Sequence, residues 1–123
     1  MPVTKSWTDV PIGTIFRNTW GWEQTNQDFY EVIGKRGKSI ILRQLKTRLL
    51  PDGDMTGHAV PLPGEYGPMP YCGGLADSLD YPIIKRPFVY ENEPLFAGRI
   101  FIKAQYGSCE IWDGKPAAYS TYA

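Results

Sequence analysis

The sequence is poor in the residues that build metal sites and covalent frameworks. It has two cysteines and one histidine among 123 residues. Cys72, Cys109 and His58 lie far apart, whereas a structural zinc site needs about four ligands, usually with closely spaced Cys or His pairs. Two cysteines are also too few for a disulfide framework, and we expect both as free thiols in a reducing compartment. We therefore expect no metal site and no cofactor.

Long apolar runs and a charge excess of one sign are also missing. No run approaches the roughly 18 apolar residues that span a bilayer, and the first residues lack the basic-then-apolar pattern of a signal peptide. We therefore expect no membrane partner and a cytoplasmic location. The formal net charge is zero. Residues 1–50 nevertheless hold eight basic against four acidic residues, and residues 51–100 hold three against seven, which predicts a basic and an acidic face if the two halves do not interleave.

Catalytic pairs are absent as well. Nothing near His58 suggests a nucleophile that it would activate. Cys109 lies in an expected strand, where cysteine is usually a small core residue. Asp52 and Asp54 flank a glycine, a pattern typical of turns. We expect a protein that is not an enzyme.

What the sequence does contain is typical of one folded domain of β-strands. Hydrophobic residues make up 42% and aromatic residues 14%, and a chain of this length buries a core without disulfides. Aromatic and β-branched residues favour strands. We expect a single β-rich domain over residues 1–123.

Short strand-like runs separated by turn residues predict about seven strands. The expected strands and their closing segment cover residues 10–20, 28–33, 39–45, 55–62 (a short edge strand), 83–90, 99–104, 108–112 and 117–122. Turns are expected at Lys35–Lys38, where Gly37 supplies a positive φ, and at Asp113–Pro116 as a hairpin. Residues 63–82 predict a long Pro/Gly-rich irregular loop with one helical turn at 75–79. The pattern indicates a mainly β fold, a small antiparallel barrel or sandwich, with an SH3-like arrangement as one option.

One element carries a resemblance. Residues 20–30 begin Trp-Gly-Trp-Glu-Gln-Thr-Asn and end Phe-Tyr. This resembles a family of small uncharacterised phage and mobile-element proteins with the element Trp-Gly-aromatic-x-Gln-Thr-Asn-x-x-Phe-Tyr. The resemblance continues in residues 34–45, 55–57, 112–116 and 120–122. It implies an accessory protein of a mobile element, and such elements commonly carry inhibitors of host defence.

Two segments provide candidate binding residues. The loop from Trp20 to Asp28 offers aromatic rings that could stack on a planar ligand and polar groups that could hydrogen-bond the edge of that ligand. Alternatively, the tryptophans of the loop fill one end of a barrel, and Asn26 hydrogen-bonds the backbone of the turn. The basic hairpin suits phosphates, with Phe29 or Tyr30 nearby for stacking; alternatively, its lysines are solvated and protect a sheet edge. The candidate residues are Trp22, Gln24, Asn26, Asp28, Tyr30, Lys35, Arg36 and Lys38.

Two functions follow from these features. The first is a non-enzymatic phage protein that inhibits a host defence or processing component through protein–protein contacts in the bacterial cytoplasm. Its partner is then an unidentified host protein. The alternative is a nucleic-acid-binding β-barrel in which the hairpin Lys35–Lys38 grips phosphates and aromatic side chains stack on bases.

Overall fold

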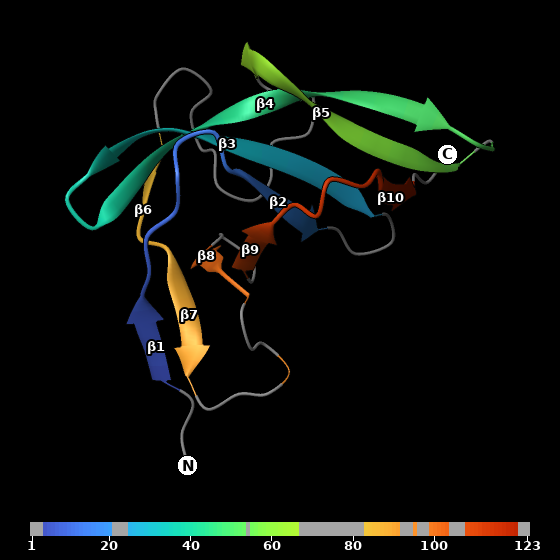
Figure 1. Cartoon of the computed structure of the whole chain (residues 1–123). Helices are drawn as coiled ribbons and strands as arrows, with labels where there is room; N and C mark the ends of the chain where they lie inside the picture. Colours follow the sequence, from blue (N-terminus) through green and yellow to red (C-terminus); the bar gives the residue numbers. More distant parts are fainter. Residues whose placement is uncertain are drawn as a thin grey trace.

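Antiparallel strands make up the architecture, as the alternating β-branched and aromatic runs predict. The computed structural model describes residues 4–20, 25–53, 55–66, 83–91, 95, 99–103 and 108–120, and these residues form ten strands and no helix (Figure 1). The mainly β prediction is confirmed. Within this part of the chain, no helix is long and apolar enough to cross a membrane.

The ten strands are short at both ends of the chain and long in its middle. Their bounds are β1 Thr4–Trp7, β2 Ile15–Trp20, β3 Asn26–Arg36, β4 Ser39–Pro51, β5 Thr56–Tyr66, β6 Ile83–Lys85, β7 Phe88–Glu91, β8 Phe101–Lys103, β9 Ser108–Ile111 and β10 Ala117–Ser120. They form one open sheet in the order β1-β7-β8-β9-β2-β3-β4-β5-β10, and β6 pairs with β4 beside this path. In Figure 1, β4 and β5 extend together as a long ribbon, and β1 and β7 lie side by side.

The hairpin between β3 and β4 is confirmed at the predicted turn. Arg36 pairs with Ser39, and Gly37 has a φ of 61°, which glycine adopts without a steric penalty. Both strands are longer than expected, and β4 reaches Pro51 because it changes partner along its length. Its residues up to Gln44 pair with β3, and some of them also with β6. From Leu45 on it pairs with β5, with a register shift between Leu45 and Thr47.

The predicted loop over residues 63–82 is wrong at its start, because residues 63–66 belong to β5. The expected edge strand is also wrong, since β5 pairs with β4 on one side and β10 on the other. The prolines of β5 are tolerated because β10 pairs only with residues 56–59 of β5. Pro61 and Pro63 therefore need donate no hydrogen bond on the side of β5 that faces β10. Residues 67–82, including the expected helical turn, lie outside the described residues.

Other strands differ from the prediction for reasons of pairing. Strand β1 was not expected, and it forms by pairing with β7. The expected strand 83–90 is two strands, because Pro87 lies between them and donates no ladder bond. The segment after Asp113–Pro116 pairs with β5 and not with β9, so this turn closes no hairpin.

Two hydrophobic clusters lie on opposite faces of the central strands. The first contains Val10, Phe16, Tyr30, Val32, Ile40, Leu42, Ile102 and Cys109. The second contains Phe29, Leu45, Ala59 and Ala117, with Trp112 and Tyr119 packed against it. Phe29 and Tyr30 are neighbours in β3 and both are fully buried, since successive side chains of a strand point to opposite faces. Strand β3 is therefore covered on both faces at these two positions.

Candidate functional site

The predicted loop site is only partly described. Trp22 and Gln24 lie outside the described residues, as does the side chain of Asn26, whose backbone pairs with Trp20. Asp28 is buried at 2% exposure, and Tyr30 is fully buried in the first cluster. Neither side chain is therefore presented at the surface.

The basic hairpin, in contrast, is exposed. Lys35, Arg36 and Lys38 all lie on the surface at the β3–β4 turn. The Lys35 ammonium forms an ion pair of 2.9 Å with Asp9. Within the described part of the chain, no carboxylate lies within ion-pairing distance of Arg36 or Lys38. The turn therefore presents cations that are open to an anionic ligand.

Strand β1 brings an exposed tryptophan to this turn. Trp7 is 43% exposed, its indole N–H donates a 2.6 Å hydrogen bond to the carbonyl of Lys38, and the Lys38 ammonium lies 5.8 Å from the ring centroid. Such a cation over an indole face is a favourable electrostatic contact. The sequence analysis missed Trp7, because only the pairing of β1 with β7 places it here. The expected stacking residues, Phe29 and Tyr30, are both core residues.

Two further cations reach the same end of the sheet. Lys85 pairs with Ile40, the second residue of β4, and the exposed Arg86 follows it. Trp7 pairs with Phe88, and the amide of Thr8 donates to the carbonyl of Pro87. We call this surface the basic end and define it by Trp7, Lys35, Arg36, Lys38, Lys85 and Arg86.

The three other cations of β4, which are Arg43, Lys46 and Arg48, lie outside the basic end. Arg43 lies over the ring of Tyr66, with its guanidinium carbon 4.7 Å from the centroid. The Tyr66 hydroxyl donates a 2.5 Å hydrogen bond to Glu31, and this bond raises the pKa of Tyr66. Lys46 and Arg48 are exposed on the long β4–β5 ribbon. The cations of β4 and those of the hairpin therefore do not form one continuous stripe.

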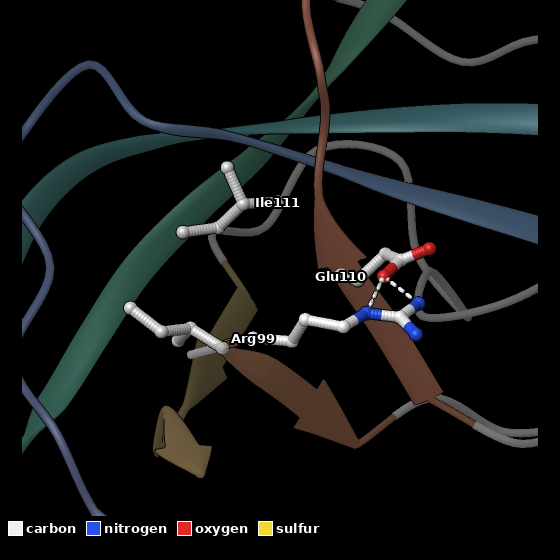
Figure 2. A pocket seen from close by; sticks show the side chains of 4 residues that line it. Arg99, Glu110 and Ile111 are labelled. Atoms are coloured by element: carbon white, nitrogen blue, oxygen red, sulfur yellow. Dashed lines mark hydrogen bonds and ion pairs between the residues drawn. The ribbon is translucent and has the colours of Figure 1, made fainter. Parts of the chain in front are cut away.

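A polar network surrounds a hollow of about 230 Å³ lined by Arg99, Ile100, Glu110 and Ile111. Figure 2 shows the Arg99 guanidinium bonded to the carboxylate of Glu110. The other oxygen of Glu110 accepts a 3.2 Å bond from Arg17, which also donates to Thr19. Because one carboxylate engages both guanidiniums, these arginines cross-link neighbouring strands.

A second hollow, of about 280 Å³, brings together segments that are distant in sequence. Thr25, Thr56 and Ser120 all line it, together with Asp52 and His58. Asp52 accepts a 2.7 Å bond from the Thr56 hydroxyl and lies 3.4 Å from Nδ1 of His58. The Ser120 hydroxyl accepts a bond from the Thr25 amide. No hydrogen bond joins Ser120 to His58 in the described structure, so the geometry does not present an activated nucleophile.

Candidate metal ligands and thiols were compared with their surroundings in the described residues. They contain no group of three or more His, Cys, Asp or Glu side chains that could hold a metal ion. Cys109 is a free, fully buried thiol, as expected, whereas Cys72 lies outside the described residues. Burial, with a smaller effect of Asp28, raises the pKa of Cys109 to about 12, so this sulfur is a poor nucleophile at neutral pH.

Comparison with known proteins gives no relative: no family model matches the chain, and neither a curated protein nor a solved structure is significantly similar to it.

Proposed function

We propose that this protein binds nucleic acid through the basic end. The observation that supports the proposal is that five cations and one exposed tryptophan, from three separate segments of the chain, lie at one end of the sheet. Phosphate backbones bind such surfaces because Lys and Arg displace the condensed counterions of the polyanion. Aromatic rings among the cations add contacts to bases.

Charge reversal of the hairpin tests the proposal. Lys35, Arg36 and Lys38 are changed together to Glu, and binding of fluorescein-labelled 20-nucleotide DNA and RNA, single-stranded and duplex, is followed by anisotropy over a range of salt concentrations. We expect the affinity to fall by tenfold or more. The slope of log affinity against log salt should also decrease by about 2 to 3, since each lost phosphate contact removes about 0.7 to 0.9.

A matched control separates local contacts from overall charge. Lys46, Arg48 and Lys115 are exposed, lie outside the basic end, and give the same charge change when all three are replaced by Glu. We expect this variant to bind within about threefold of the wild type, because Debye screening weakens distant charges. Equal losses in the two variants, or no binding by the wild type, would overturn the proposal.

A closed arrangement of the strands fits such a binding surface, and we propose that the central strands form a small barrel. Strand β6 pairs with β4, and β7, only two residues further on, pairs with β8. The pairings β8–β9, β9–β2, β2–β3 and β3–β4 then lead back to β4. The first cluster draws its residues from β2, β3, β4, β8 and β9, which supports a barrel interior.

A second candidate function rests on the free end of the β4–β5 ribbon. Leu49, Leu50 and Met55 are all at least 39% exposed there, and grouped exposed apolar residues mark protein-binding surfaces. We propose an apolar surface on a host defence or processing protein as the partner, in the bacterial cytoplasm. The resemblance to phage and mobile-element proteins supports this setting.

Surface variants test this second function. Leu49, Leu50 and Met55 are changed together to Ser, and the wild type and the variant are each used to capture proteins from a bacterial lysate. A host protein retained by the wild type and by the hairpin charge-reversal variant, but lost with the triple Ser variant, supports the proposal. Equal capture by all three proteins refutes it.

A further inference from the structure

Trp7 is held in place although it is exposed. The indole N–H is fixed on the carbonyl of Lys38 at 2.6 Å, and β1 is paired with β7 from Thr4 to Trp7. The ring therefore keeps its orientation without being buried. A side chain that is ordered before binding loses less conformational entropy when a ligand arrives.

A comparison with Trp112 shows what is distinctive about Trp7. Trp112 makes the same kind of bond, from its indole N–H to the carbonyl of Lys115 at 2.6 Å. Its ring, however, packs edge-on against Phe29 at a centroid distance of 5.8 Å, as part of the second cluster. In the described part of the molecule, no aromatic ring contacts Trp7, and its one cation is that of Lys38.

Further cations lie at the same end of the sheet as Trp7. Arg36, Lys38 and Arg86 lie at the same end of the sheet, and none of them forms an ion pair with a carboxylate in the residues that the structure describes. A strand whose phosphates contact these cations brings its bases close to the indole. Only an unpaired base can then stack on it, because in a duplex both faces of each base are covered by neighbouring bases.

We propose that Trp7 makes the basic end selective for single-stranded nucleic acid, with one unpaired base stacked on its indole ring. This inference rests on the proposed function, and it adds the class of nucleic acid. Phosphate contacts give affinity for any strand, whereas the tryptophan contributes only when a base is free to stack.

Binding of single strands and duplexes by Trp7 variants tests the inference. The probes are a fluorescein-labelled 12-nucleotide single strand and a duplex of the same length. We expect Trp7→Ala to lower affinity for the single strand about tenfold, within the range of base–aromatic stacking, and for the duplex less than about twofold. Trp7→Phe keeps a stacking ring and should retain most of the single-strand affinity. Trp112→Phe is the matched control and should change neither affinity.

A direct measurement covers the case in which Trp7→Ala disturbs β1. With 5-fluorotryptophan at all four tryptophans, the ¹⁹F resonance that is missing from Trp7→Phe belongs to Trp7. It should shift when the single strand is added and stay in place with the duplex. If the wild type binds both probes, two results overturn the inference but leave the proposed function standing. One is an equal loss of affinity for the two probes in Trp7→Ala, and the other is no shift of this resonance. Absence of wild-type binding to either probe refutes both.

Discussion

At the scale of single residues, Asn18 stands out because it is polar and almost completely buried. Its side chain is 1% exposed, and neither its Oδ1 nor its Nδ2 has a hydrogen-bond partner in the described structure. Asn18 pairs with Asp28 across β2 and β3. An unsatisfied buried amide costs about 1 to 3 kcal/mol, so this position weakens the fold.

Replacing the Asn18 amide should therefore stabilise the protein. We expect Asn18→Leu, which keeps the branch at Cγ, to raise the free energy of unfolding by about 1 kcal/mol, measured by urea denaturation. Asn18→Asp places a second carboxylate beside Asp28 and should lower it. A destabilised Asn18→Leu variant would show that the amide makes bonds that support the fold.

Gly57 is a second residue whose identity follows from its neighbours. A Cβ atom there would lie 2.6 Å from the hydroxyl of Tyr119 and 2.7 Å from the carbonyl of Leu50. We expect Gly57→Ala to lower the free energy of unfolding by about 1 to 3 kcal/mol, the usual range for overpacking. Tyr119→Phe should not rescue it, because a ring carbon and a backbone carbonyl remain in the way.

The control for Gly57 lies in the same hairpin. A Cβ at Gly53 would meet only the Thr56 hydroxyl, at 3.3 Å. Gly53→Ala should therefore change stability by less than about 0.5 kcal/mol, as is usual for surface positions. Thermal or urea unfolding of both variants decides the matter, and equal effects would argue against close packing of β10 on β5.

At the scale of elements, the sequence predicted best where a strand pair depends on a local turn. The β3–β4 hairpin was predicted because Gly37 and its charged neighbours identify the turn. The runs that form β8 and β9 were predicted as well, and they pair as neighbours in the chain. Contacts between distant segments carry no such signal, and the positions of β1, β6 and β10 all depend on them.

The same limit applies to the candidate site. Local patterning identified Lys35, Arg36 and Lys38, because turn lysines are exposed whatever the rest of the fold does. It did not identify Trp7, which is near the hairpin only through β1. It also assigned Tyr30 to binding, because a strand that is buried on both faces does not show the alternation by which exposed positions are recognised.

At the scale of the whole molecule, the buried thiol makes stability depend on alkaline pH. The pKa of Cys109 rises from its ordinary 9.0 to about 12 in the folded protein, so between these values the folded state binds more protons than the unfolded state. Stability from this group is fully present below pH 9 and falls as the pH rises toward 12. By pH 10 the loss should reach about 1 kcal/mol.

Comparison with a variant isolates this effect from other alkaline groups such as lysines. Cys109→Ala lacks the thiol, so its free energy of unfolding should decline less steeply than that of the wild type between pH 8 and 10. Urea denaturation at each pH gives the two slopes. Parallel slopes would mean that the thiol ionises in the folded protein as readily as in the unfolded chain.

The change of partner along β4 has a consequence for local unfolding of the protein. Leu42 belongs to the first cluster and Leu45 to the second, so only three positions of one strand separate two groups of packed side chains on opposite faces. Opening either group requires β4 to move, and that movement disturbs the other. The two clusters should therefore open in hydrogen exchange as one cooperative unit. We expect similar protection for the amides that join β4 to β3 and for those that join β4 to β5.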